Sequence, residues 1–492
     1  MRALTRPVSP SLKTLTAATR LSRLAHSTNM ASTADLPYNM HVTPDNTGLW
    51  HIRQTDEAAK KVSELLQEDM EKHHVFFNQL HYHNHIPHHL LALYGTGAPP
   101  SSLQTAYVNN TTYQRPALSP HTDEPVNLRP WPSAAARYLG DETYYPDFLR
   151  FFQSEMPAAA ASAASSSSSS SSWQPVVRKY LFDSGSDDLL LRMFAGVLHP
   201  LIQLMYGVEW GQEAIVAEAL AQAAVHEGWV GEYLLEAERL ARQGGGEGKG
   251  KEAGEGVMEL IAAVRANPKL AGAARHGDAN KIRDGVLARA RDEMLAIAAR
   301  VRVRPDQKEV EEKTAEMFDA ALFVAAAAAM VKDGKQPKFD FFLMHHVTSS
   351  PFFVTLNAQD WVPVEIKARM LEWKIRMDLL QYVARGAPEL LAEKLAAYQP
   401  RKPEAGGSLA DIIARLHTFQ DDGHGIKLGR AAVICHNICK KYEQEGKGWL
   451  KLTGDELWNK VCHLIVDSLE APGPRWVRSC GFDEAWEEIP NI

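Results

Sequence analysis

Hydrophobic residues recur at helical spacing along most of the chain. Over residues 56–73 the apolar positions share one face of a 3.6-residue helix and charged residues occupy the other face. The same spacing, in segments rich in Ala, Leu, Glu and Arg, predicts further helices over residues 213–242, 286–301, 308–331, 363–384 and 429–442. Alternating apolar and polar positions, typical of strands, are scarce. We therefore predict an all-α, multi-helical fold.

Two low-complexity stretches interrupt this pattern. Residues 158–172 end in eight consecutive serines, and residues 244–256 are mostly Gly, Glu and Lys. Neither has the apolar content to pack, so both are predicted to be flexible surface insertions in one large domain spanning residues 36–492.

Residues 1–35 differ from the rest of the chain. The first 34 residues contain five basic side chains, several leucines and no acidic side chain. This composition fits a mitochondrial presequence, and it also fits a disordered leader or an upstream start with Met30 as the true first residue. The expected location is therefore cytoplasmic or mitochondrial.

The net charge of the chain indicates which kinds of ligand it is suited to bind. The formal net charge is −7, and it becomes about −12 without the basic leader, which argues against nucleic acid as the main ligand. No apolar run reaches the length of a membrane span. The segment Gly95-Thr96-Gly97 lacks the third glycine of a dinucleotide fingerprint, so an NADPH cofactor would have to bind in another way. The oligomeric state is left open.

Seven of the 20 histidines lie between positions 73 and 89. Neutral imidazoles are common ligands of zinc and iron. His85 and His89 are four residues apart, so on a helix they would project from one side and share a metal ion. Pro87 leaves two alternatives, a kinked helix or a helix that begins after His85. For this pair the sequence does not decide between ligands and surface or capping residues.

Three later segments place polar side chains in apolar surroundings. His199 lies within a strongly apolar stretch, and either His345 or His346 is expected to face inward. Lys427 follows Asp421 and Asp422 on a predicted helix face that is otherwise apolar. A buried lysine loses its charge readily and can then take up carbon dioxide as an anionic carbamate. A hydrogen-bonded core histidine and a lysine paired with an aspartate remain open alternatives, and spacing does not show whether these segments meet.

Four segments in this order resemble the questin oxidase-like family: residues 84–97, residues 199–209, residues 344–349 and residues 422–431. The resemblance extends from about residue 36 to residue 486. It implies a fungal enzyme that oxidatively cleaves a quinone or anthrone ring of a polyketide-like aromatic substrate with O2, described either as an iron-dependent dioxygenase or as an NADPH-linked Baeyer–Villiger oxidase. Carried onto this chain, the iron-dependent description implies Fe(II) held by His85, His89, His199, His345 and a carboxylated Lys427. It also implies that His424 orients a ligand or acts as acid or base.

Other functions are not excluded at this point. A metal-free, NADPH-driven Baeyer–Villiger oxidase would need none of these ligands. A zinc hydrolase is a second alternative, although no H-E-x-x-H motif supplies its general base. A non-catalytic α-helical scaffold or carrier is a third, and it would tolerate substitution of His85, His199 and Lys427.

Overall fold

The computed structural model describes residues 38–163, 172–244, 254–403 and 407–492. These residues form α-helices joined by loops and short 3-10 or π segments, and they contain isolated β-bridges but no β-strand. The predicted all-α fold is confirmed. The first half of the chain contains α2 (Asp56–Lys72), α3 (Ile86–Gly95), α4 (Pro100–Thr111), α5 (Tyr145–Ala163), α6 (Trp173–Val177), α7 (Asp188–Arg192), α8 (His199–Glu209), α9 (Glu213–Val225) and α10 (Val230–Gly244).

The second half continues in the same way. It contains α11 (Val257–Ala266), α12 (Pro268–Ala271), α13 (Leu287–Arg289), α14 (Arg291–Ala298), α15 (Gln307–Ala328), α16 (Phe341–Thr348), α17 (Pro351–Asn357), α18 (Val364–Ala384), α19 (Ala392–Ala397), α20 (Leu409–Ala414), α21 (His424–Gln444) and α22 (Asp455–Glu470). No helix in the described part of the chain is long and apolar enough to cross a membrane.

Helix α2 shows how local sequence sets an element. The Thr55 side chain accepts a hydrogen bond from the Ala58 backbone N–H and so satisfies one of the free donors at the helix start. The buried face carries Val62, Leu65 and Leu66, as the periodicity predicts. The predicted segment, residues 56–73, is therefore correct to within one residue.

The prediction of one helix over residues 213–242 is wrong. The chain forms α9 and α10, separated by a break at residues 226–229. His226 ends α9 in an extended conformation, and its carbonyl accepts a hydrogen bond from Arg192 instead of continuing the helical pattern. Gly228 in the break is a weak helix former. The predicted helix over residues 286–301 likewise divides, into a π segment, α13 and α14.

The low-complexity stretches lie partly outside the described residues. Helix α5 continues through the first part of the predicted insertion, as far as Ala163, and Gly244 is the last residue of α10. Residues 164–171 and 245–253, and with them the predicted leader, lie outside the described residues, so their flexibility stays a prediction.

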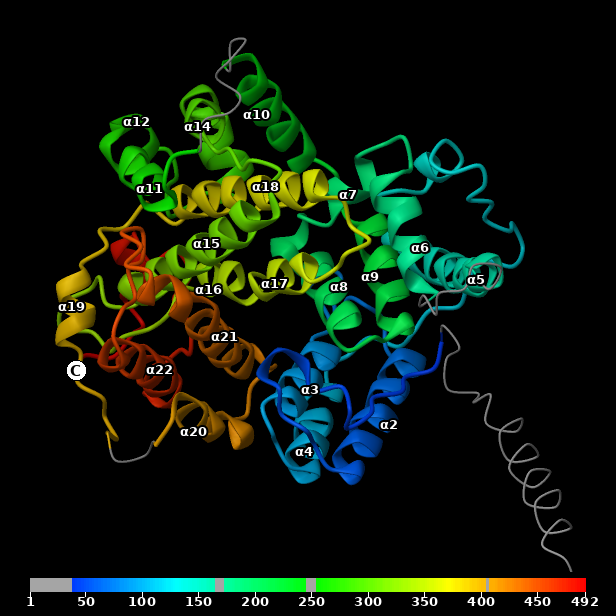
Figure 1. The fold of residues 1–492 in the computed structure, drawn as a ribbon, viewed down its shortest axis with the longest axis horizontal. Helices are drawn as coiled ribbons and strands as arrows, with labels where there is room; N and C mark the ends of the chain where they lie inside the picture. The colour runs from blue at the N-terminus through cyan, green and yellow to red at the C-terminus, as the bar shows by residue number, and fades with distance from the viewer. Residues whose placement is uncertain (1–37, 164–171, 245–253, 404–406) are drawn as a thin grey trace, which may run out of the picture.

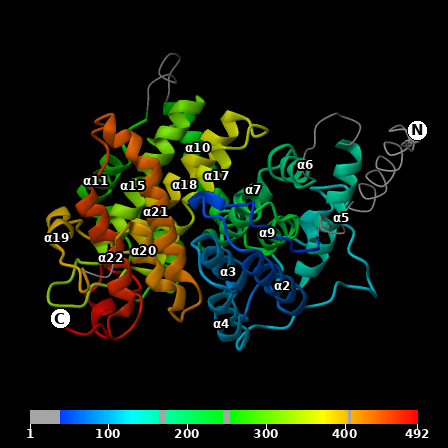
Figure 2. The same ribbon diagram turned by 60° about the horizontal axis from the view of Figure 1, so that its bottom comes forward.

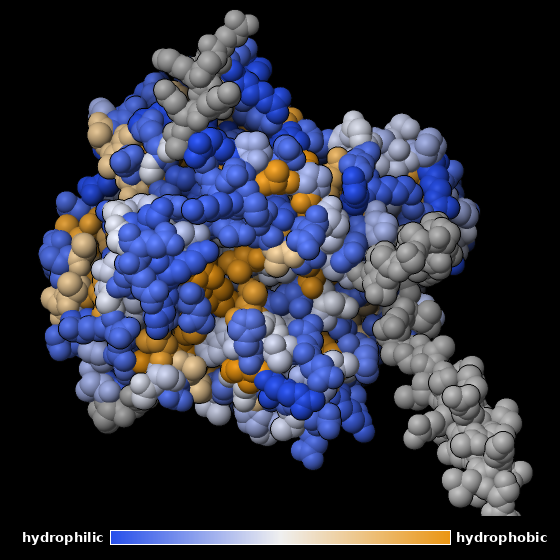
Figure 3. All heavy atoms as spheres, viewed as in Figure 1, coloured by the Kyte–Doolittle hydropathy of each residue, from blue (hydrophilic) through white to orange (hydrophobic). Residues whose placement is uncertain are grey.

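The helices pack so that distant segments meet in the middle of the molecule. Helix α21 lies against α3, α15 and α16, while α8 packs on α3, α9 and α17. Figures 1 and 2 show α3, from the first quarter of the chain, beside α21, from the last. The face in Figure 3 is mostly hydrophilic, with a hydrophobic area near its middle. The helices that carry the predicted site residues are thereby brought together.

Glu218 is a buried carboxyl group next to α8. It lies on α9, and its Oε2 accepts a hydrogen bond of 2.8 Å from Gln203 Nε2 on α8. Burial raises the pKa of Glu218 to about 8, and the nearby Asp69 adds to the shift. The side chain is therefore mostly protonated at neutral pH.

The pKa of Glu218 predicts a pH-dependent stability. Between the ordinary pKa of 4.5 and about 8, the folded chain binds a proton at Glu218 that the unfolded chain releases. Stability from this group is complete below pH 4.5 and is lost as the pH rises through about 8. Glu218→Gln removes the titration. As the pH is raised from about 5.5 to about 8.5, the melting temperature of the parent should therefore fall by a few degrees more than that of the variant. A difference that does not change with pH in a thermal-shift measurement would contradict this prediction.

Candidate metal centre

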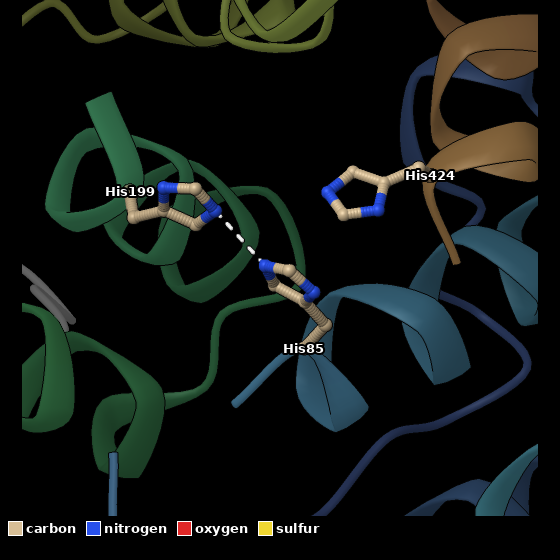
Figure 4. Close-up of side chains that lie close together, drawn as sticks. All are labelled: His85, His199 and His424. Atoms are coloured by element: carbon tan, nitrogen blue, oxygen red, sulfur yellow. Dashed lines mark hydrogen bonds between the residues drawn. The ribbon is translucent and has the colours of Figure 1, made fainter. Parts of the chain in front are cut away.

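Four buried imidazoles from four separate segments form a closed ring. His85 immediately precedes α3, His199 is the first residue of α8, His345 lies in α16 and His424 is the first residue of α21. The ring centroids of His85 and His424 are 4.5 Å apart, and those of His345 and His424 are 4.8 Å apart. The other two sides, from His199 to His345 and to His85, measure 4.9 and 5.1 Å. Figure 4 shows three of these imidazoles converging.

Unusual backbone conformations place two of the four histidines. Gly196, Val197 and Leu198, directly before His199, all have positive φ, at 52°, 55° and 66°. This conformation is unfavourable for valine and leucine, and strain of this kind persists where the surrounding structure enforces it. Gly423, before His424, has φ +89°, and a Cβ atom there would lie 2.6 Å from the Cβ of His89. Only glycine fits that turn.

Each imidazole is oriented by an oxygen atom at its Nδ1. His85 and His424 Nδ1 contact the two carboxylate oxygens of Asp422, at 3.1 and 2.6 Å. The other two contact backbone carbonyls, His199 with Gly196 at 2.6 Å and His345 with Phe341 at 2.5 Å. These oxygens only accept hydrogen bonds, so each Nδ1 must carry the proton. In the neutral rings every Nε2 is then left with a lone pair.

Burial keeps these rings neutral. It lowers the pKa of His85 to about 3, and the charge of Lys427 adds to the shift. Burial is also the main cause that lowers the pKa values of His199 and His345 well below 6.5, and it lowers that of His424. Neutral imidazoles with free Nε2 atoms are the form in which histidine binds metal ions.

The Nε2 atoms face one another in pairs, an arrangement that a bound cation would stabilise. His85 Nε2 is 2.9 Å from His199 Nε2, the contact drawn in Figure 4, and His345 Nε2 is 3.1 Å from His424 Nε2. With the protons on Nδ1, neither pair has a hydrogen to share, and facing lone pairs repel. Two nitrogens at roughly 2.1 Å from one metal ion and about 90° apart would be separated by about 3 Å. The contact between His85 and His199 fits adjacent positions around one ion, and ligand atoms of His85, His199 and His424 all lie within 4.8 Å of one another, a group that does not include His345.

Lys427 lies beside this ring. It follows His424 by one turn of α21, and its side chain is buried. Burial lowers its pKa to about 8, although Asp422 and Asp421 oppose the shift. Among the described residues the amine forms no ion pair with either aspartate. Roughly a tenth of the amine is therefore uncharged at pH 7, far more than for an ordinary lysine, and this is the state needed for carbamate formation.

The structure brings together most, but not all, of the predicted site residues. His85, His199 and His345 lie in the ring and Lys427 lies beside it, whereas His89 does not take part. The Nδ1 of His89 faces Asn110 Nδ2 at 3.4 Å, because one helical turn and the packing of Gly423 carry its ring away from the other imidazoles. His424, expected to orient a ligand, occupies the position in the ring that His89 was expected to fill.

Two further histidines and Asp422 belong to the site and were not predicted. His83 stacks on His199 with ring centroids 3.9 Å apart, and its Nε2 is 2.8 Å from His226 Nε2. Asp422 had been considered only as a partner of Lys427. The crowding of histidines around position 83 was a signal for the first of these residues, but nothing in the local sequence points to His226.

The ring lies in the wall of a large cavity. The cavity has a volume of about 1300 Å³, and His85, His199 and His424 are among its lining residues. Aromatic side chains make up much of the remaining wall: Phe77, Tyr82, Tyr113, Phe194, Trp229, Phe341, Phe342 and Trp476. A cavity of this size and lining suits a flat polycyclic ligand.

Fold and site together define an α-helical protein with a buried ring of four histidines beside an aromatic cavity, and three of them, His85, His199 and His424, could bind a metal ion. The questin oxidase-like family model matches residues 82–432, a range that contains all four histidines and Lys427. The chain belongs to this family.

The chain aligns with relatives of known name over nearly its whole length. The chain is 32% identical to the oxidoreductase AflY of Aspergillus parasiticus, covering 93% of this chain and 94% of that protein. It is 34% identical to the Baeyer-Villiger monooxygenase dmxR6 of a Cryptosporiopsis species, over 90% and 97% of the two chains. It is also 34% identical to a questin oxidase of Aspergillus fumigatus, over 89% and 95%. These relatives confirm the prediction of an enzyme of the oxidoreductase class.

Proposed function

We propose that this protein is a non-haem iron oxygenase that uses O2 to cleave a ring C–C bond next to a carbonyl in a polycyclic phenolic or quinone-like substrate. The observation that carries the proposal is the ring of four neutral imidazoles beside an aromatic cavity, in which Nε2 atoms face one another in two pairs at 2.9 and 3.1 Å and His85, His199 and His424 form a group that could hold a metal ion. The names of the relatives, questin oxidase and Baeyer-Villiger monooxygenase, support the same kind of bond cleavage.

His85, His199, His345 and His424 would hold the iron, and a carboxylated Lys427 would add an anionic oxygen ligand. Iron(II), when bound, supplies electrons to O2. Mixed nitrogen and oxygen donors without thiolate suit this ion. Asp422 keeps the protons of His85 and His424 on Nδ1, which leaves both Nε2 atoms free. The carbamate forms when the neutral Lys427 amine adds to CO2 and releases one proton.

The rest of the chain positions the substrate and excludes water. The aromatic wall places a planar substrate beside the histidines, and the surrounding helices limit solvent access to the reacting atoms. Dioxygenation would put both atoms of O2 into the ring-opened product and would consume no external reductant. The Baeyer–Villiger names of the relatives also fit a second reaction, in which NADPH is consumed, one oxygen atom enters the substrate and the other leaves as water.

The lysine provides the sharpest test of this ligand set. Protein purified without oxygen and reconstituted with Fe(II) and carbon-13 bicarbonate should show a carbamate signal in its NMR spectrum. Lys427→Met, which keeps the length of the side chain but has no amine, should lose that signal and bind iron at least about tenfold more weakly.

Two results would contradict this proposal. One is the absence of stoichiometric iron in parent protein reconstituted in this way, together with NADPH-dependent turnover, which would favour the metal-free oxidase. The other is an unchanged iron affinity in Lys427→Met, which would remove the lysine from the ligand set.

A further inference from the structure

A second group of polar side chains faces the same cavity from α18. Gln381 and Arg385 are four residues apart and both line the cavity. Both are buried, with exposed fractions of 3% and 4%. Gln381 Nε2 and Arg385 Nε have no hydrogen-bond partner among the described residues. Two buried donors one helical turn apart therefore point toward the same space without an acceptor.

Arg385 also lacks a carboxylate partner. No ion pair joins it to an acidic side chain in the described part of the chain, and its guanidinium lies 4.2 Å from the centre of the Phe342 ring. Burial lowers the pKa of Arg385, and Asp340 is the main negative charge that opposes this shift. The oxygens of Asp340, however, already accept four backbone N–H groups, those of Phe342, Leu343, Ser479 and Cys480.

Other positively charged side chains line the same cavity as Arg385. Burial and then the Arg385 charge lower the pKa of Lys281, which also lines the cavity and whose amine donates to the His276 and Asp278 carbonyls. The Arg478 guanidinium lies 4.8 Å from the centre of the Phe341 ring, which in turn contacts the imidazoles of His345 and His424. A guanidinium therefore lies over the ring of each of the two neighbouring phenylalanines, and both arginines line the cavity.

A buried cation without an anionic partner is unfavourable, because burial removes its hydration and the Phe342 ring replaces only part of it. A ligand that brings an anionic oxygen would accept from both unpaired donors and pair with the charge. The stacked Phe342 ring and guanidinium also present a flat surface suited to an aromatic ligand.

We propose that Arg385, with Gln381 and Lys281, forms a subsite that binds an anionic oxygen on a planar aromatic ligand, either a carboxylate or an ionised phenol. This subsite would fix which end of the molecule faces the four histidines. The inference rests on the proposed function only in assigning this ligand to the substrate, because binding itself requires neither iron nor turnover.

Equilibrium binding under anaerobic conditions tests the subsite with two matched ligand pairs. The pairs are anthraquinone β-carboxylate with its methyl ester, and β-hydroxyanthraquinone with its methyl ether, both at a pH that ionises the acids. The parent protein should bind at least one anion about tenfold more tightly than its neutral partner. The pair that shows the preference identifies the oxygen as carboxylate or phenolate.

Arg385→Met should abolish the preference while affinity for the neutral ligands stays within about threefold. Arg475→Met is the matched control, because Arg475 also lines the cavity and stacks on an aromatic ring, that of Phe419, but is exposed. It should keep the preference. The ligand-free Arg385→Met protein should melt no lower than the parent, since an unpaired charge has been removed; a structural arginine would lower the melting temperature.

Three results would overturn the proposal. The parent could bind both members of each pair equally, or the preference could survive in Arg385→Met. The third is that Arg385→Met keeps its affinity for all four anthraquinones and loses affinity only for NADP+, which would make Arg385 part of a dinucleotide site. None of these results depends on iron content or oxygenase activity. A failed subsite is therefore distinguishable from a failed oxygenase.

Discussion

Replacing His85 with alanine is expected to remove the bound metal ion and reduce oxygen consumption by at least about a thousandfold. The substitution deletes one of the three imidazoles whose ligand atoms lie within 4.8 Å of one another and leaves His199 Nε2, its neighbour at 2.9 Å, without a counterpart. Metal content by mass spectrometry should fall from about one ion per chain to below about a tenth. Circular dichroism should show an unchanged helical content, because the replaced side chain lies at a cavity wall and not within the packed apolar core.

His89→Ala is the matched control. His89 lies one helical turn further along α3 and is equally buried, but its ring faces Asn110 and not the other imidazoles. Alanine keeps the Cβ atom against which Gly423 packs. Metal content should therefore stay near one ion per chain, with activity within about threefold of the parent. Loss of metal in His89→Ala as well as in His85→Ala would restore the ligand set implied by the resemblance, whereas retention of metal in His85→Ala would reject both sets.

Asp422→Asn is expected to weaken metal binding by about a hundredfold or more. One carboxylate holds the Nδ1 protons of both His85 and His424, and outer hydrogen-bond partners of this kind contribute about 10- to 100-fold each to metal affinity. An amide accepts through only one of its two polar atoms. At least one histidine is then free to move its proton to Nε2, the atom needed for the metal. Titration of the metal-free protein with Co(II), followed by its absorption spectrum, measures the change.

Asp421→Asn separates this effect from helix capping. The Asp421 carboxylate accepts the backbone N–H groups of Gly423 and Gly425 at the start of α21 and forms no hydrogen bond with a ligand imidazole. Its replacement should lower stability by about 1 kcal/mol and change metal affinity by less than about threefold. Equal losses of affinity in the two variants would mean that Asp422 acts only by shaping the loop.

The helices were largely predictable because each depends on a local pattern. The spacing of Val62, Leu65 and Leu66 buries one side of α2 wherever that helix lies in the molecule. Breaks were harder to predict. The end of α9 at His226 depends on a hydrogen bond from Arg192, a residue outside the helix, so composition over residues 213–242 does not reveal it.

The sequence predicted which segments contribute to the site, but it predicted less well which residue of each segment does so. The four segments named from the family resemblance each contribute one imidazole to the four-histidine ring. The choice between His89 and His424 could not be made by counting residues, because spacing of four along a helix says that two side chains share a face and not what that face contacts. Two of the four Nδ1 acceptors are the backbone carbonyls of Gly196 and Phe341, which no side-chain pattern encodes.

The sequence by itself determined the all-α fold class, most of the helix positions and the segments that carry the histidines and the lysine. Only the tertiary structure decided that His424 joins His85, His199 and His345, that Asp422 orients two of them, and that Arg385 faces the same cavity without an acidic partner. The physical reason is that helix formation depends on neighbours within a few residues. A metal centre depends on where the ends of α3, α8, α16 and α21 meet, and that is set by packing between helices far apart in the chain.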